Sequence, residues 1–193
     1  MLSEILKDKK IILGSRSPRR KFFLEELDLD FEIRLKEVEE KFPDTLTRTE
    51  ITDYLAKLKA APFLAELKDN EILITADTIV WLDGKAIGKP ENAADAKEML
   101  SKLSGNVHEV ISTIAITTNK QTSLINETTK VRFKTLTNVE INYYIDKFKP
   151  FDKAGSYGIQ EWIGYIGIEK IEGSYFNVMG FPVQKFYELM SKM

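Results

Sequence analysis

Runs of apolar residues and period-two alternation predict strands along much of the chain. The apolar run at residues 10–14 is typical of a buried strand, and the β-branched stretch Glu71–Leu82 is typical of one strand or two. Val107–Thr118 and Thr122–Thr135 alternate as paired strands would on either side of Asn119-Lys120. Further extended segments are expected at Phe31–Leu35 and Ile159–Ile171.

Helical spacing of apolar residues separates these strands. The pattern predicts a helix at residues 18–28 and a second from near Thr49, which Pro62 should kink or interrupt. A third is expected at residues 93–103, with Gly105 as its C-terminal cap. The remaining helices are expected at Val139–Phe148 and Val183–Met190, and Glu37–Asp44 is expected to be a loop. Helices interspersed with long strands indicate an α/β fold, with a mixed sheet.

Length and charge narrow the class of protein. A chain of 193 residues is long enough for one domain with a substantial core, so residues 1–193 are expected to form a single domain. The net charge of −2 argues against a broad basic face that coats nucleic acid, so no stable nucleic-acid complex is expected. A small local basic pocket remains compatible with this balance.

The chain has no cysteine and one histidine, which excludes thiolate and multi-histidine metal sites. The charged N-terminus lacks the apolar core of a signal peptide, and no apolar run approaches membrane-spanning length. A cytoplasmic location without membrane contact is therefore expected. His108, at the start of a strand, is interpreted as a structural histidine rather than a catalyst.

Residues 11–20 read as a strand, a loop and the start of a helix. Gly14 lets the backbone turn and approach a ligand closely, while Ser17 suits a helix N-cap with Pro18 at the first helical position. A helix that starts here directs free N–H groups at an anion, and the Arg19-Arg20 pair adds forked donors. The stretch predicts a phosphate-binding loop. A basic surface loop is the alternative.

Asp77 is the least expected residue of its strand. Aspartate is depleted from strands, and alternation places it on the same face as Leu73, Thr75 and Ile79. A carboxylate on an apolar face is costly unless something compensates for its burial. A metal ion or a water-activating role would compensate. The alternative is a buried aspartate that caps a loop or pairs with an arginine.

Other charged and polar residues give weaker signals. Lys59 lies on the same side of its helix as Leu55, and Lys89 follows a glycine in a rigid loop, so each suits either phosphate or solvent. One carboxylate of the acidic segment at residues 37–40 could complete an Mg²⁺ shell. Gln160 ends a small-residue loop, and its amide has the donor and acceptor needed to read a base edge.

Five motifs in order resemble the Maf family of nucleoside triphosphate pyrophosphatases, over nearly the whole chain. They are Ser15 with Ser17-Pro18-Arg19-Arg20, Ala76-Asp77-Thr78, Gly88-Lys89-Pro90, the loop Lys153–Gln160, and Gly173-Ser174-Tyr175 with Asn177-Val178-Met179-Gly180. The resemblance implies an elongated mixed sheet flanked by helices, with two lobes around a nucleotide cleft. It also implies hydrolysis of a nucleoside triphosphate to the monophosphate and pyrophosphate, with a divalent cation such as Mg²⁺, Mn²⁺ or Co²⁺.

The resemblance also assigns roles to residues. Asp77 would be the catalytic base and, with Glu40, a metal ligand. The implied phosphate-binding residues are Ser15, Arg20, Lys59 and Lys89. The combination of Arg19, Thr78 and Gln160 resembles the branch that acts on dTTP and UTP.

The chain departs from the family pattern at Gly14, where alanine is frequent, at Arg16, where a small residue is common, and at Phe181, where leucine is usual. Arg16 either alters phosphate affinity or points to solvent. Two alternatives stay open: a pyrophosphatase of the same fold for other nucleotides, and a nucleotide-binding division regulator without turnover. A homodimer is compatible with either reading.

Overall fold

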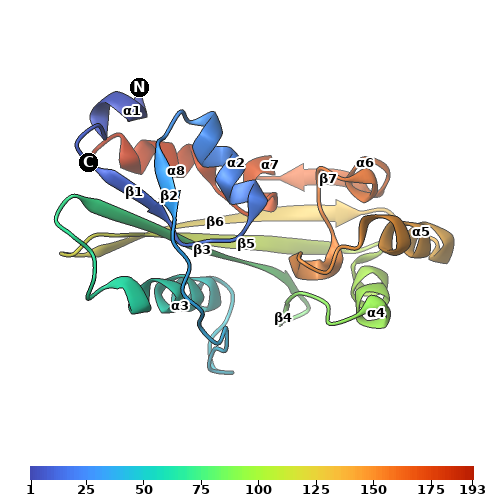
Figure 1. Ribbon diagram of the computed structural model, residues 1–193. Coiled ribbons are helices and arrows are strands. Elements are labelled where there is room, and N and C mark those ends of the chain that lie inside the picture. Colours follow the sequence, from blue (N-terminus) through green and yellow to red (C-terminus); the bar gives the residue numbers. More distant parts are fainter. The chain divides into compact units, whose positions relative to one another are not determined.

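The computed structural model describes all of residues 1–193 and has a mixed α/β fold (Figure 1). Its strands are β1 (Lys10–Leu13), β2 (Phe31–Ile33), β3 (Glu71–Leu82), β4 (Lys85–Ile87), β5 (Val107–Thr117), β6 (Thr122–Phe133) and β7 (Ile168–Glu172). They form one sheet in the order β2-β1-β3-β5-β6-β7, and β4 pairs with β3. β1 is parallel to β2 and β3, whereas the β3–β4 and β6–β7 pairs are antiparallel. The expected α/β class with a mixed sheet is confirmed.

Helices precede, separate and follow these strands in the chain. They are α1 (Leu2–Ile5), α2 (Pro18–Glu26), α3 (Thr49–Ala60), α4 (Ala93–Leu103), α5 (Asn138–Phe148), α6 (Trp162–Gly167), α7 (Tyr175–Val178) and α8 (Val183–Met190), with 3₁₀ turns η1 (Ala61–Phe63) and η2 (Ala154–Ser156). The interruption expected at Pro62 is confirmed, because α3 ends just before it. None of the helices has the length and apolar character needed to cross a bilayer.

The chain divides into two compact units. Unit 1 comprises Met1–Asp77, Ser112–Glu127 and Gly180–Met193, and unit 2 comprises Thr78–Ile111 and Thr128–Met179. The expected single domain over residues 1–193 and the nucleotide cleft between two lobes stay predictions.

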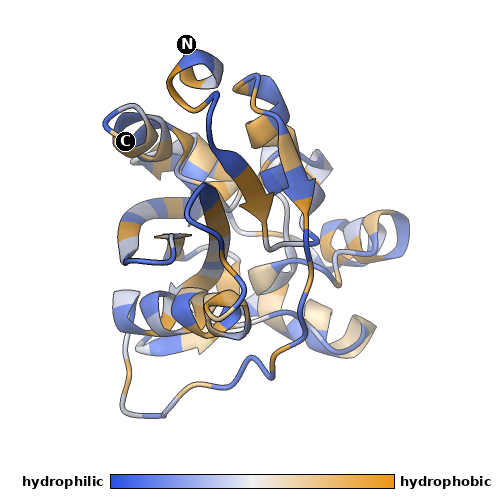
Figure 2. Cartoon of the chain, turned by 60° about the vertical axis from the view of Figure 1, so that its left-hand side comes forward, coloured by the Kyte–Doolittle hydropathy of each residue, from blue (hydrophilic) through white to orange (hydrophobic).

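In unit 1, helices cover both faces of the sheet. Figure 1 shows α2 and α8 on one face and α3 on the other. The first pair of helices meets through three aromatic rings. The ring centroid of Phe181 lies 5.9 Å from that of Phe23 and 5.1 Å from that of Phe186. On the α3 side, Ile12 of β1 packs in a buried cluster with Ala60. In Figure 2 the helices show both hydrophilic and hydrophobic colours, as expected of elements with one face against a sheet.

In unit 2, an aromatic cluster surrounds the one histidine of the chain. His108 of β5 is 1 % exposed, and its Nε2 lies 2.7 Å from the hydroxyl of Tyr157. The rings of Phe133 and Tyr157 pack edge-on against the imidazole. Burial lowers the pKa of His108 to about 4. The imidazole is therefore neutral and structural at neutral pH, in agreement with the interpretation from sequence.

The burial of His108 predicts a loss of stability in mild acid. Its pKa in the folded chain is about 4, below the ordinary 6.5, so between these values the unfolded chain binds more protons. The free energy of unfolding should therefore decrease by about 3 kcal/mol from this group as the pH falls from 6.5 to 4. Urea unfolding at several pH values measures this. Carboxyl groups titrate over the same pH range in the wild type and in His108→Gln, so the difference between the two proteins isolates the contribution of the imidazole. Parallel pH profiles of the free energy of unfolding would contradict the prediction.

One predicted element is wrong. The segment Ile159–Ile171 was expected to be extended, but it holds helix α6 followed by strand β7. Ile163 and Gly167, four residues apart, are both buried, and a side chain at Gly164 would meet the carbonyl oxygen of Ile159 at 1.9 Å. Close packing of a glycine-rich turn against its own backbone thus overrides the β-branched composition. Elements α1, β4 and α7 were not predicted from the sequence.

Candidate functional site

The loop after β1 lies beside the middle of β3. Leu13 pairs with Ile74 in the parallel register, and the Gly14 N–H donates to the Ile74 carbonyl at 2.8 Å. Gly14 does not have a positive φ, so a left-handed backbone conformation is not the reason for a glycine at this position. A glycine is required because the loop passes close to β3: a Cβ at this position would lie 2.9 Å from the Thr75 methyl carbon.

Helix α2 begins directly after this loop. Ser17 is the N-cap residue and Pro18 the first helical residue, so both expected positions are confirmed. The Ser17 side chain makes no capping hydrogen bond. Instead its backbone N–H donates to the Ser15 hydroxyl oxygen at 3.2 Å, which makes Ser15 the residue that organises the turn.

Arg20 of α2 is held by three acceptors. Its Nη1 donates to the Ala76 carbonyl at 2.7 Å and to the Ser15 hydroxyl at 3.4 Å, and its Nε donates to the Gly180 carbonyl at 3.2 Å. Burial lowers the pKa of Arg20, while the nearby Asp77 carboxylate raises it. The guanidinium is thus fixed next to the strand that carries Asp77.

Asp77, Lys59 and Glu40 form the charged centre of unit 1. Lys59 Nζ lies 2.5 Å from Asp77 Oδ1 and 3.0 Å from Glu40 Oε2. Asp77 is 6 % exposed, whereas the Glu40 side chain is 46 % exposed. One ammonium therefore joins a buried carboxylate to a carboxylate at the surface.

The environment of Asp77 suits a group that exchanges protons. Burial is the largest influence and raises the pKa of Asp77 above its usual range, against the lowering effects of Lys59 and Arg20. A carboxylate with a raised pKa is a better proton acceptor than an ordinary one. The sequence also allowed a structural aspartate that pairs with an arginine. In the structure the residue that donates a hydrogen bond to Asp77 is instead a lysine, Lys59.

The other acids of the same segment have different partners. Glu37 pairs with Arg16 at 2.8 Å, and Glu39 pairs with Lys41. The Arg16 side chain is 69 % exposed, so of its two expected placements the structure favours solvent. Glu40 alone among these three glutamates reaches Lys59.

The remaining predicted residues occupy other positions. Arg19 is half-buried in α2 beside Arg20, and Thr78 is half-buried in β3 directly after Asp77. Lys89 and Gln160 belong to unit 2. Lys89 is exposed, and the Gly88 carbonyl before it accepts from the Gly155 N–H at 2.9 Å. The Lys89 loop and the loop Lys153–Gln160 are thus joined.

Gln160 presents an unused acceptor. Its side-chain Oε1 is enclosed and has no hydrogen-bond partner, while its backbone carbonyl accepts from the Tyr165 hydroxyl at 2.5 Å. A buried amide oxygen without a partner is uncommon and costly. This oxygen is therefore suited to accept a hydrogen bond from a ligand that carries a donor.

The loop that ends in Gln160 is held by residues that were not predicted as functional. Lys153 Nζ lies 3.0 Å from the Glu161 carboxylate, which also accepts from the Tyr144 hydroxyl. The Gly158 N–H donates to that hydroxyl at 3.0 Å. The sequence feature that could have indicated these contacts is Lys153 itself, a lysine at the start of a loop of small residues. A lysine that is buried there requires an acidic partner.

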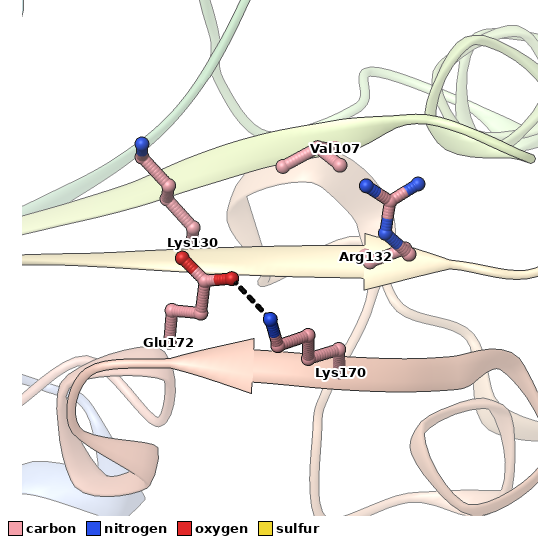
Figure 3. A pocket seen from close by; sticks show the side chains of 5 residues that line it. All are labelled: Val107, Lys130, Arg132, Lys170 and Glu172. Atoms are coloured by element: carbon pink, nitrogen blue, oxygen red, sulfur yellow. Dashed lines mark ion pairs between the residues drawn. The ribbon is translucent and has the colours of Figure 1, made fainter.

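A second charged group lies on the outer face of β6 and β7 (Figure 3). Lys130, Arg132, Lys170 and Glu172 line a cavity of about 200 Å³ together with Val107. Lys170 and Glu172 form an ion pair at 2.6 Å, and both side chains are more than half exposed. This group contains none of the residues expected in the site and has the exposure of a solvated sheet face.

The strand β1 ends beside a fixed arginine, and the parallel strand β3 next to it carries a carboxylate that pairs with a lysine. Such an arrangement is typical of a protein that binds phosphorylated ligands. The family follows from comparison with known proteins. Residues 10–193 match the Maf family, described as Maf-like protein, and the chain belongs to it.

Curated relatives are similar over the whole chain. The dTTP/UTP pyrophosphatase of Flavobacterium johnsoniae is 55 % identical over 193 residues, which is 100 % of both chains. Those of Flavobacterium psychrophilum and Christiangramia forsetii are 57 % and 51 % identical, over 97 % and 100 % of this chain and 96 % and 98 % of theirs. Among solved structures, the dITP/XTP pyrophosphatase of Mycobacterium abscessus aligns with a TM-score of 0.45 and 17 % identity, over 93 % of this chain and 92 % of that one.

Proposed function

We propose that this chain hydrolyses nucleoside triphosphates, preferentially dTTP and UTP, to the monophosphate and pyrophosphate. The observation that carries the proposal is the buried Asp77 carboxylate, held against Lys59 and beside Arg20. Full-length relatives that are named dTTP/UTP pyrophosphatases support the choice of substrate.

Asp77 is the proposed base. A water molecule attacks the α-phosphorus, the bond from that phosphorus to the α–β bridging oxygen breaks, and pyrophosphate leaves with the electron pair. The proton of the water goes to the Asp77 carboxylate, whose raised pKa favours its acceptance. Such chemistry depends mainly on positioning and on neutralising charge.

The cations bind the triphosphate. Arg20 is fixed by its contacts to Ala76, Gly180 and Ser15, so its guanidinium is pre-organised rather than ordered on binding. Lys59 supplies a second positive charge. Lys89, which is exposed in its loop, supplies a third.

Pyrimidine selection is assigned to Gln160 with Arg19 and Thr78. The partnerless Oε1 of Gln160 would accept the N3–H of thymine or uracil, and its amide N–H would donate to a ring carbonyl. A cytosine bound in the same pose would place its N3, which is an acceptor, against Oε1, so that oxygen would stay unsatisfied.

The residues of unit 1 fit a divalent cation that arrives with the substrate. Asp77 and Glu40 place two carboxylates against one ammonium, so this position already favours positive charge. The chain has no group of three or more His, Cys, Asp or Glu side chains that could hold a metal alone. Mg²⁺ is typically held by one or two carboxylates with waters and substrate phosphates. Asp77 and Glu40 would therefore hold Mg²⁺, Mn²⁺ or Co²⁺, which when bound neutralises phosphate charge and lowers the pKa of bound water.

A substrate panel tests the proposed function. Purified chain is incubated with dTTP, UTP, dCTP, CTP, purine triphosphates and modified nucleotides, each with Mg²⁺, Mn²⁺ or Co²⁺, and pyrophosphate and monophosphate are measured. We expect dTTP and UTP to be turned over fastest, with equal amounts of both products. EDTA should abolish turnover, and added cation should restore it.

The same panel separates the alternatives. Faster turnover of purine or modified nucleotides would favour the related pyrophosphatase activity. Tight nucleotide binding without pyrophosphate release under any cation would favour a regulator without turnover. The cytoplasmic location, the homodimer and the absence of a stable nucleic-acid complex stay predictions.

A further inference from the structure

Thr75 of β3 lies next to helix α3 and next to the loop after β1. Its side chain is fully buried, and its hydroxyl donates to the Ala56 carbonyl of α3 at 2.7 Å. Ala56 precedes Lys59 by one turn of α3, and Thr75 precedes Asp77 on the same face of β3. One hydrogen bond thus ties the helix that carries the ammonium to the strand that carries the carboxylate.

The methyl group of Thr75 faces the loop after β1. A Cβ on Gly14 would lie 2.9 Å from the Thr75 methyl carbon and 3.3 Å from Leu73 Cδ1. Gly14 precedes Ser15, whose hydroxyl accepts from Arg20. The methyl group therefore limits how closely the phosphate loop can approach β3.

We propose that Thr75 is a positioning residue for hydrolysis, an inference that rests on the proposed function. A β-branched side chain has a stiff χ1, so one rotamer sets both the hydroxyl toward α3 and the methyl group toward Gly14. Rotation that relieves a contact at the methyl group breaks the hydrogen bond to Ala56. Thr75 thereby aligns Lys59, Asp77 and the Ser15–Arg20 pair without contact with the substrate.

Two replacements of Thr75 separate its two contacts. Thr75→Val keeps the shape and loses the hydroxyl, whereas Thr75→Ser keeps the hydroxyl and loses the methyl group. Thr117→Val is the matched control, because Thr117 is also a fully buried strand threonine in unit 1. Its hydroxyl lies 3.1 Å from that of Thr122.

Steady-state kinetics on dTTP with Mg²⁺ measure the effect. All charges of the site remain in Thr75→Val, so KM should change less than about twofold, while misalignment should lower kcat on the order of tenfold. Thr75→Ser, which keeps the hydrogen bond to Ala56 but loses the methyl group, should lower kcat less than Thr75→Val does, and Thr117→Val should retain the wild-type kcat. Wild-type kcat in Thr75→Val, or an equal loss in Thr117→Val, would overturn the inference.

A double-mutant cycle tests the contact with Gly14. Gly14→Ala should lower both the melting temperature and kcat, because the new methyl group meets that of Thr75. Adding Thr75→Ser removes the opposing methyl group and should restore most of both losses. Additive losses in the double variant would contradict the proposed coupling.

The experiments distinguish failure of this inference from failure of the proposed function. A wild-type chain that hydrolyses none of the triphosphates would refute the function. The crystal structure of Thr75→Val then decides the positioning role without any activity. A displaced Lys59 ammonium supports it, and one that still lies 2.5 Å from Asp77 Oδ1 overturns it.

Discussion

Replacing Asp77 with asparagine is expected to lower kcat by about 10²- to 10⁴-fold, the range that a general base contributes. Asparagine has nearly the same shape, but its amide cannot accept the proton of the attacking water at neutral pH. Loss of the negative charge also removes one of the two carboxylates proposed to hold the cation. The measurement is pyrophosphate release from dTTP in the presence of Mg²⁺.

The matched control for this change is Asp83→Asn. Asp83 is exposed in the turn between β3 and β4, where its φ of 49° is one that asparagine also adopts readily. We expect this variant to hydrolyse dTTP as the wild type does. Circular dichroism should show both variants folded, because each change is conservative in volume. Near-wild-type hydrolysis by folded Asp77→Asn would exclude Asp77 as the base.

The fold was predictable where the apolar pattern is long and regular. The strands near residues 10–14 and 71–82 and the helices α3, α4 and α5 follow from periodicity, because each has a continuous buried face. The segment Ile159–Ile171 failed for a physical reason. Its helix has only six residues, and its glycines allow a close approach that intrinsic preference cannot show.

Individual residues of the candidate site were predictable from the sequence, but the ion pairs between their charged side chains were not. A carboxylate on a buried strand face marks Asp77, and its expected place among apolar neighbours agrees with its burial. Glu37, Glu39 and Glu40 are alike in composition and differ only in which cation each reaches. The path of the chain between β2 and α3 determines which glutamate reaches Lys59. No local sequence pattern predicts that path.

Thr75 shows a second limit of sequence reasoning. Its alternation with Asp77 predicted a shared face, but its two contacts come from the helix α3 and from the loop after β1. Each partner is distant in sequence, so only the packing of three elements reveals the role. Gly14 was noted as a departure from the family pattern, and the structure supplies its reason as room for the Thr75 methyl group.

Replacing Lys59 with methionine is expected to destabilise the fold as well as to slow the reaction. Methionine preserves the apolar stem but leaves the Asp77 carboxylate buried without its direct partner. Removal of one member of a buried ion pair typically lowers the free energy of unfolding by roughly 3–5 kcal/mol. Lys59 is 16 % exposed, so we expect a loss near the lower end of that range. Urea unfolding of the variant at pH 8 measures it.

The pH dependence and a double variant identify the cause of that loss. Without Lys59 the pKa of Asp77 in the folded chain rises further above its unfolded value, so the folded chain binds more protons and stability falls as the pH rises. Lys59→Met should therefore be least destabilised in mild acid. Adding Asp77→Asn removes the unpaired charge and should recover most of the stability at pH 8, while activity stays lost. A double variant as unstable as Lys59→Met alone would show that lost packing, rather than an uncompensated buried charge, accounts for the effect.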